Sequence, residues 1–178
     1  QIKLQTEEYK ETELGLLPKE WEITLLKNVV NIKKGKKPKI LSEELNADYL
    51  PYLTAEYFRT GVVKQFAALK NDKLIKVEKD DIVFIWDGSN AGDVFTGLYG
   101  ILASTMVRIS PDENRLLKKM LYYFLKTKFE LFNTKTTGST IPHVNKNLFE
   151  NLTVPLPPLP EQKSIAFVLS TIQTAKEK

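Results

Sequence analysis

The sequence of 178 residues contains no cysteine and a single histidine, His143. Without cysteine the chain can form no disulfide bridge, thiolate metal site or cysteine nucleophile, and one histidine alone cannot build a zinc site. Long hydrophobic runs are also missing, because stretches such as Ile82 to Trp86 are only as long as a strand, whereas a membrane-spanning helix needs about 18 apolar residues. Nothing at the start resembles a signal peptide, so we expect no membrane association and a cytoplasmic location.

What is present suits one globular domain with an appendage, since 42% of the residues are hydrophobic and 27% are charged. The chain starts without methionine and stops at Lys178 inside a helical pattern, so we expect a fragment. We divide it into a DNA-binding recognition domain at residues 1–156 and a proline-rich connector with the start of a helix at residues 157–178.

Strand-like and helix-like segments alternate irregularly along the chain. Short strands are expected at 21–25, 49–54, 82–86 and 105–109, with further extended pieces at 62–69 and 148–156. Ile82 to Trp86 is expected to be buried on both faces, and four glycines between Asp87 and Gly100 indicate turns around a short strand. Residues 26–32 are expected to form two helical turns, residues 114–132 a long amphipathic helix, and residues 1–13 a loosely held lead-in. This pattern predicts an α/β (α+β) domain with a curved, mixed, largely antiparallel sheet and packed helices.

The C-terminal segment predicts a projecting helix of the coiled-coil type. Prolines 155, 157, 158 and 160 form a stiff connector. Beyond them, apolar residues recur at alternating spacings of three and four. The candidate helix-packing residues are Ile165, Val168, Leu169 and Ile172. Nothing within the chain is expected to cover this seam, which indicates a missing partner helix.

The charge is unevenly distributed, although the net charge is only +4. Residues 27–39 carry six lysines and no acidic residue, and a second basic stretch runs from Arg115 to Lys135. Lysine is a point charge suited to phosphates, so these stretches favour a polyanionic partner such as nucleic acid. A solvated, lysine-rich surface is the competing interpretation.

Signatures of catalysis are weak. The glycine-rich segment 88–92 lacks the Lys-Ser/Thr pair of a P-loop and the oxygen ligands of a calcium loop. Glu161-Gln162-Lys163 resembles half of a nuclease metal site, but it follows prolines at the start of a helix rather than lying on a sheet strand. We therefore expect no enzymatic activity.

Two segments carry a resemblance to a known family. Thr12-Glu13-Leu14-Gly15-Leu16-Leu17-Pro18-Lys19-Glu20-Trp21-Glu22 resembles the entry segment of the specificity subunit of type I restriction-modification enzymes. Leu156-Pro157-Pro158-Leu159-Pro160-Glu161-Gln162-Lys163-Ser164-Ile165-Ala166 is similar to the segment that leads from a target recognition domain into the spacer helix of that family. Residues 81–88 and 138–144 also match its pattern. The resemblance covers about residue 12 to the end.

The resemblance implies sequence-specific recognition of double-stranded DNA without catalysis. Such a subunit carries two recognition domains, each reading half of a bipartite target, and two long helices that set the half-site spacing. It directs methyltransferase (modification) subunits and, through the complex, an endonuclease (restriction) subunit. S-adenosylmethionine, ATP and Mg then belong to partner subunits, and this chain needs no cofactor. With one domain and the start of one helix, self-association through that helix is a further expectation.

Candidate DNA-contacting residues were chosen from polar loops flanked by basic stretches. The expected phosphate contacts are Lys33, Lys34, Lys36, Lys37, Lys39, Lys135 and Lys146. The expected base-reading residues are Tyr57, Arg59, Ser89, Asn90, Thr136, Thr137, Ser139, His143 and Asn145. Tyr57 is equally compatible with the edge of the core, and Ser89 and Asn90 with a plain turn.

Two other hypotheses stay open from the sequence. One is an enzyme fragment, either a stand-alone nuclease using Glu161 or an adenine methyltransferase. The other is a protein-interaction module with incidental DNA affinity. Cleavage abolished by Glu161→Ala, or binding that ignores DNA sequence, would favour them respectively.

Overall fold

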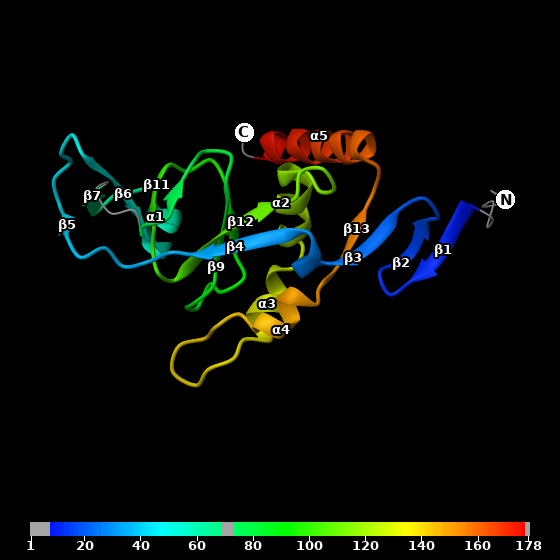
Figure 1. The fold of residues 1–178 in the computed structure, drawn as a ribbon, viewed down its shortest axis with the longest axis horizontal. Helices are drawn as coiled ribbons and strands as arrows, with labels where there is room; N and C mark the ends of the chain where they lie inside the picture. The colour runs from blue at the N-terminus through cyan, green and yellow to red at the C-terminus, as the bar shows by residue number, and fades with distance from the viewer. Residues whose placement is uncertain (1–7, 69–72, 177–178) are drawn as a thin grey trace.

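A computed structural model describes residues 8–68 and 73–176, which form an elongated molecule (Figure 1). A hairpin near the N-terminus lies at one end and a small sheet at the other, with the helices between and beside them. The strands and the 3-10 turn of the first half are β1 (Tyr9–Thr12), β2 (Gly15–Pro18), β3 (Glu22–Leu25), η2 (Leu26–Asn28), β4 (Val30–Lys34), β5 (Leu41–Ser42), β6 (Tyr49–Leu53), β7 (Phe66–Ala68) and β8 (Lys76–Val77). The later strands are β9 (Ile82–Ile85), β10 (Val94–Phe95), β11 (Gly100–Leu102), β12 (Met106–Pro111) and β13 (Thr153–Leu156). The α-helices are α1 (Ala55–Thr60), α2 (Lys118–Lys126), α3 (Phe129–Thr134), α4 (Lys146–Glu150) and α5 (Leu159–Lys176).

Two sheets organise the centre of the domain. The first has the order β10-β9-β12-β4 and is antiparallel throughout. The second has the order β5-β7-β6-β11-β8, in which only the β6–β11 pair is parallel. The pairs β1–β2 and β13–β3 form separate two-stranded sheets. The predicted α+β class with a mixed, largely antiparallel sheet is confirmed, with the strands divided between these sheets.

Strand β9 separates two hydrophobic cores. Its side chains alternate between faces, as in any strand, so that Ile82 and Phe84 enter one core and Val83 and Ile85 the other. All four are buried, which confirms the expectation of a strand that is apolar on both faces. In the first core, Phe84 meets Phe132 and Phe149 edge-on, with ring centroids 5.3 and 5.4 Å apart. Helices α3 and α4 are thereby packed against the sheet.

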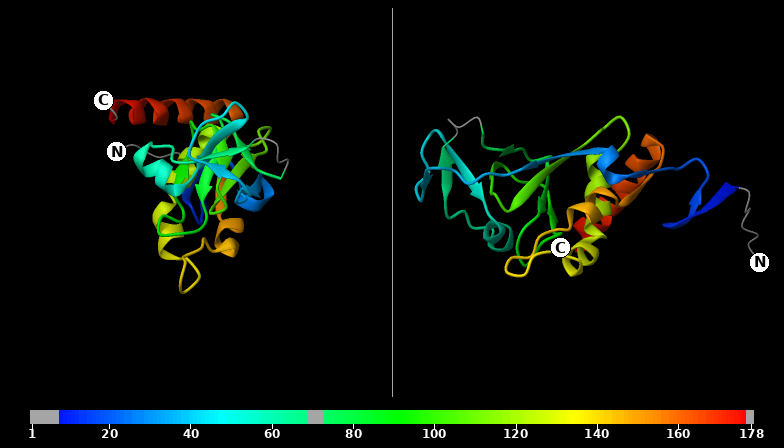
Figure 2. Two further views of the ribbon diagram at one scale, coloured as in Figure 1. Left: turned by 90° about the vertical axis from the view of Figure 1, so that its left-hand side faces the viewer. Right: turned by 60° about the horizontal axis from the view of Figure 1, so that its bottom comes forward.

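Helix α5 packs along α2, on the opposite side of the molecule from α3 and α4 (Figures 1 and 2). Ile165 packs against the first core, and Ala166 is buried. The expectation that nothing within the chain covers the apolar residues of this helix is therefore wrong for its first turns. The reason is that α2 has an apolar face of its own, against which the first turns of α5 pack.

Several predicted elements differ from the observed ones because long-range pairing decides them. Residues 26–32 form a 3-10 turn and strand β4 rather than two helical turns, since β4 pairs with β12 over its whole length. The lead-in is ordered from Tyr9 as strand β1, while residues 1–7 lie outside the described range. The extended piece at 62–69 is β7 alone, and Leu69 is not described.

Two further differences concern helix boundaries. The expected helix at 114–132 is divided into α2 and α3, with a break at Thr127 and Lys128. The expected strand at 148–156 is shortened to β13, because the Asn145 side chain accepts a hydrogen bond from the Leu148 N–H and so begins helix α4. Pro155 is tolerated in β13 because that strand pairs only with β3.

Candidate nucleic-acid interface

The predicted phosphate-contacting lysines are exposed along β4 and the segment that follows it. Lys33 and Lys34 lie on β4, and Lys36, Lys37 and Lys39 lie on the segment that crosses toward the second sheet. The backbone of this segment is held at Gly35, whose N–H donates to the Met106 carbonyl at 2.9 Å. A Cβ at this glycine would lie 2.6 Å from the Leu102 carbonyl oxygen. This close approach fixes the backbone and leaves the lysine side chains directed to solvent.

A glycine-rich turn follows the buried strand β9. Gly88 and Gly92 adopt φ values of +111° and +100°, which favour glycine, and Ala91 is buried between them. Ser89 is exposed and Asn90 half-buried. The Asn133 side chain of α3 donates to the Ser89 and Ala91 carbonyls at 2.9 and 3.0 Å. These hydrogen bonds attach the turn to helix α3, which leads into the polar loop at residues 135–145.

The polar loop 135–145 connects α3 to α4 and is closed at its base. Thr137 and His143 exchange two backbone hydrogen bonds of 2.8 and 2.7 Å. Gly138 has φ +96°, and a Cβ there would lie 2.6 Å from the Ile141 carbonyl oxygen, so the turn between these residues requires glycine. Ser139 is exposed near the tip, whereas Thr136 is half-buried. The Val144 N–H donates to the Trp86 carbonyl at 2.9 Å, which attaches the loop to the end of β9.

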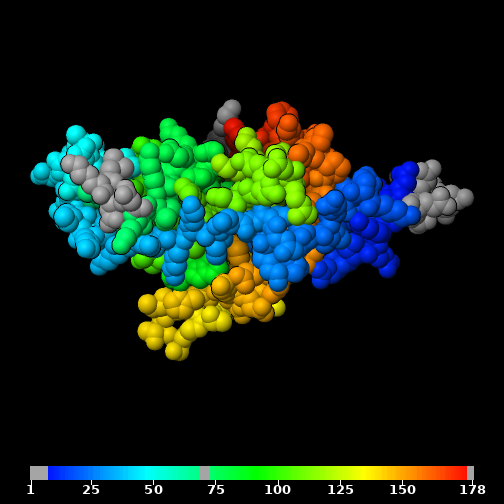
Figure 3. All heavy atoms as spheres, viewed as in Figure 1, coloured from blue at the N-terminus to red at the C-terminus, as the bar shows by residue number. Residues whose placement is uncertain are grey.

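Asp87 joins all three segments. One carboxylate oxygen lies 2.7 Å from His143 Nδ1, and the other lies 2.9 Å from Lys34 Nζ. Only 12% of the Asp87 side chain is exposed, against 52% for Lys34 and 47% for His143. The structure therefore brings together Lys34, Ser89, Asn90, the loop 135–145 and the neighbouring lysines of β4. We call this set the candidate DNA surface; Figure 3 shows the loop and the β4 segment on one face.

Other predicted residues lie elsewhere or have structural partners. Tyr57 and Arg59 lie on α1, in the lobe of the second sheet. Tyr57 packs against the second core with its ring centroid 5.8 Å from that of Phe58, whereas Arg59 is exposed. Asn145 uses its amide oxygen to cap α4, and Lys146 lies 3.5 Å from Glu150 one helical turn away. The DNA contacts of all these residues stay predictions.

The C-terminal helix has a covered side and an exposed apolar side. Of the predicted packing residues, Ile165 packs on the first core, while Val168, Leu169 and Ile172 are exposed by 36 to 55%. The sequence analysis missed Phe167, which is 72% exposed. The sequence does contain a signal for Phe167, since it is a large apolar residue between Ile165 and Val168, two residues of the heptad pattern.

Gln162 was also missed as the residue that holds α5 to α2. It is fully buried and donates to the Arg115 and Pro157 carbonyls, both at 2.8 Å, while its own oxygen accepts from the Leu117 N–H at 2.9 Å. The neighbouring Glu161 accepts a hydrogen bond of 3.0 Å from the Trp21 indole N–H. Glu161 is therefore part of the attachment of the helix, and the half-buried Trp21 serves the same contact.

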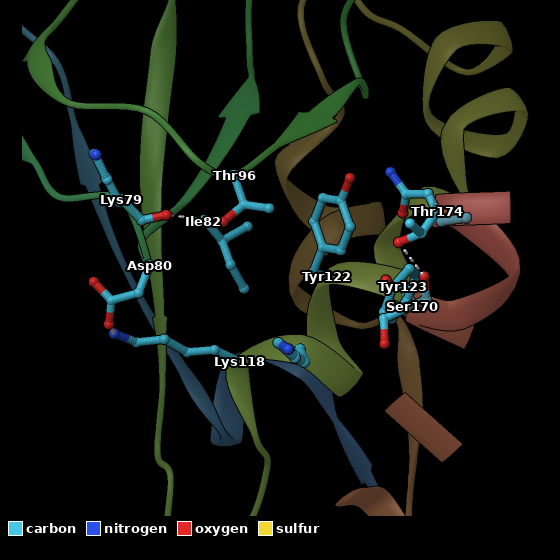
Figure 4. A pocket seen from close by; sticks show the side chains of 11 residues that line it. Lys79, Asp80, Ile82, Thr96, Lys118, Tyr122, Tyr123, Ser170 and Thr174 are labelled. Carbon is cyan, nitrogen blue, oxygen red and sulfur yellow. Dashed lines mark hydrogen bonds and ion pairs between the residues drawn. The ribbon is translucent and has the colours of Figure 1, made fainter. Parts of the chain in front are cut away.

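A groove of about 460 Å³ lies between α2, α5 and the start of β9 (Figure 4). The Lys118–Asp80 ion pair of 2.6 Å lies on one side, with Tyr122 across from it and Ser170 and Thr174 on α5. The hydrogen bond from Lys118 lowers the pKa of Asp80, and the same bond raises the pKa of Lys118. The groove lies beside the start of β9, whereas Asp87 and the candidate DNA surface lie beyond the end of that strand.

Within residues 8–68 and 73–176, no group of three His, Asp or Glu side chains is placed to hold a metal ion. Among the helices of this same part of the chain, none is long and apolar enough to cross a membrane.

Comparison with known proteins identifies the class to which this fold and surface belong. The family described as type I restriction modification DNA specificity domain matches residues 18–178. The chain therefore belongs to this family.

Individual relatives agree with this membership. The chain is 42% identical over 165 residues to the type I restriction enzyme MjaVIII specificity subunit of Methanocaldococcus jannaschii, an alignment that covers 92% of this chain and 38% of the relative. It is 25% identical over 125 residues to the EcoBI specificity subunit of Escherichia coli, covering 70% and 24%. The chain thus spans about two fifths or less of the curated relatives it matches.

Solved structures share the fold. The crystal structure of the HsdS subunit from Thermoanaerobacter tengcongensis superposes with a TM-score of 0.70 at 20% identity, covering 96% of this chain and 41% of that one. The S subunit from M. genitalium gives a TM-score of 0.65 at 23% identity, covering 86% and 39%.

Proposed function

We propose that the chain recognises one half of a bipartite sequence in double-stranded DNA on behalf of a type I restriction-modification complex. The observation that carries the proposal is the assembly of three segments, far apart in the sequence, into the candidate DNA surface. Exposed lysines supply contacts to phosphates, and the polar tips of the loop 135–145 and the turn 87–92 supply groups able to read base edges. Family membership supports the same function.

In this proposal the chain carries out no chemistry of its own. Methyltransferase subunits would bring S-adenosylmethionine, and a restriction subunit reached through the complex would bring ATP and Mg. The exposed α5 side chains Phe167, Val168 and Ile172 would pack against another helix, either the second spacer helix of a complete specificity subunit or α5 of a second copy. The apolar side chains left exposed on α5 between Phe167 and Ile172 support this part of the proposal.

The test is selection of bound duplexes from a randomised library, with and without the methyltransferase subunit. We expect enrichment of a short half-site, and an observed affinity that falls linearly with the logarithm of salt concentration. Lys36→Gln and Lys37→Gln should each reduce the slope by about 0.9 and weaken all sequences alike. Lys163→Gln, an exposed lysine of α5, is the matched control and should leave the slope unchanged.

Two outcomes would contradict the proposal. One is a library that stays unenriched both for the chain alone and with the methyltransferase subunit. The other is a salt slope that Lys36→Gln and Lys163→Gln reduce equally, because binding would then depend on total charge rather than on the candidate DNA surface.

A further inference from the structure

Asp87 is a nearly buried carboxylate placed in a surface that otherwise suits an anion. It lies two residues after the end of β9, and its backbone N–H donates to the Thr105 carbonyl at 3.0 Å. Both of its carboxylate oxygens are used, one by His143 and one by Lys34. A carboxylate so close to a phosphate-binding surface would repel DNA if it pointed outward. Its function must therefore lie in what it does to its two partners.

We propose that Asp87 is a positioning residue: it holds Lys34 and His143 in one fixed arrangement, so that β4 and the loop 135–145 present their DNA contacts together. The proposal rests on the proposed function, and it adds a residue that makes no DNA contact itself. Lys34 and His143 each keep about half of their side-chain surface exposed while Asp87 keeps 12%. Lys34 and His143 therefore face solvent, and Asp87, which orients them, lies beneath them.

The backbone around Asp87 makes this arrangement rigid. The Gly88 N–H donates to the Pro142 carbonyl at 2.9 Å, and the Val144 N–H donates to the Trp86 carbonyl at 2.9 Å. These bonds hold the chain on both sides of His143 against the chain on both sides of Asp87. The side-chain pair is thus formed between two segments that are already in register, so little further conformational entropy is lost when it forms.

The carboxylate also determines which nitrogen of His143 is available. An ionised carboxylate only accepts hydrogen bonds, so Nδ1 carries the hydrogen and Nε2 is the ring atom left for DNA.

Asp87→Asn separates positioning from charge, because the two effects have opposite signs. Loss of one negative charge should strengthen binding to a scrambled duplex and steepen its salt slope by up to about 0.9. Loss of orientation should lower the ratio of affinities for the selected and scrambled duplexes by about tenfold. Asp80→Asn is the matched control: it removes the same charge and releases Lys118 from an ion pair of 2.6 Å, but at the distant groove. It should leave the ratio within twofold.

A double-mutant cycle tests whether Asp87 acts through His143. His143→Gln alone should also lower the ratio, and the double variant should lower it by less than the product of the two separate effects, since both changes remove the Asp87–His143 interaction. If Asp87→Asn does not fold, the cycle is made with Lys34→Gln and His143→Gln, which share Asp87. Coupling above twofold supports the proposal, and additive effects overturn it.

The outcomes distinguish this proposal from the function on which it rests. A wild-type chain without sequence preference refutes the proposed function. A wild-type chain with a preference that Asp87→Asn preserves within twofold refutes the positioning role alone.

Discussion

The attachment of α5 to the domain depends on one buried side chain, Gln162. Its amide makes three hydrogen bonds, to the Arg115 and Pro157 carbonyls and from the Leu117 N–H, and none of its surface is exposed. Replacing it with alanine leaves these backbone groups without their partner. A buried donor or acceptor left unpaired costs about 1 to 3 kcal/mol.

The magnitude follows from where each orphaned group lies. The Arg115 residue is exposed, so water can reach its carbonyl at little cost, whereas Pro157 is buried and Leu117 half-buried. Counting about 1 kcal/mol for the Pro157 carbonyl and about 1 to 2 kcal/mol for the Leu117 N–H, we expect Gln162→Ala to lower the free energy of unfolding by about 2 to 3 kcal/mol. Gln162→Glu should cost at least as much, because it loses both donors and buries a charge.

Urea denaturation followed by far-UV circular dichroism and tryptophan fluorescence measures this change. Trp21, whose indole is bonded to Glu161 on the same helix, should report the release of α5 directly. Lys163→Ala, an exposed neighbour on α5, is the control and should change the free energy by less than about 0.5 kcal/mol. A Gln162→Ala variant within that same margin of the wild type would refute the reasoning.

Two other perturbations test the sheet and the groove. Gly35→Ala places a methyl group against the Leu102 and Ala103 carbonyls and should lower the free energy of unfolding by about 3 kcal/mol in urea titrations, while Asn31→Ala, exposed on the preceding strand β4, should change it by less than about 0.5 kcal/mol. Equal effects would contradict the close approach at Gly35. Asp80 has a lowered pKa in the folded state, so its stabilising contribution is complete above the ordinary aspartate pKa and is lost as the pH falls through the lowered value. The difference in the free energy of unfolding between wild type and Asp80→Asn, measured by urea denaturation, should therefore shrink as the pH falls into the acidic range. In a Lys118→Met background this difference should disappear. A difference that does not depend on pH would show that the ion pair is not its cause.

The sequence predicted the elements that local pattern determines. Ile82 to Ile85 is apolar at every position, so burial on both faces could be foreseen, and the glycines after it indicated turns around the short strand β10. Strand β4 was mistaken for helix because Val30 and Ile32 fit both periods over so short a run. Its pairing with β12, some 75 residues on, decides the outcome. No spacing within β4 reveals that partner.

The composition of the basic stretches and polar loops predicted residues of the candidate DNA surface, but not the side-chain interactions that join them. Lys34 and His143 were chosen because they lie on a basic stretch and a polar loop, and the structure places them on either side of Asp87. Asp87 itself, like Gln162, is a polar residue whose importance arises from partners far away in the chain. Only the pairing of β4 and β9 with β12, and the backbone bonds between the loop 135–145 and residues 86–88, bring those partners within hydrogen-bonding distance.

Under the proposed function, the arrangement of the domain separates the surface for reading DNA from the helix for assembly. The loop 135–145 and helix α5 lie at opposite ends of the first core (Figures 1 and 2), and the rings of Phe84, Phe132 and Phe149 fix the helices at both ends of that loop. The exposed residues 139–141 can therefore change in sequence without disturbing α3, α4 or the contact between α2 and α5. If so, substitutions at the tip should alter which half-site is bound while leaving the stability and helix packing measured at Gln162 untouched. Substitutions at Phe84 should damage both together.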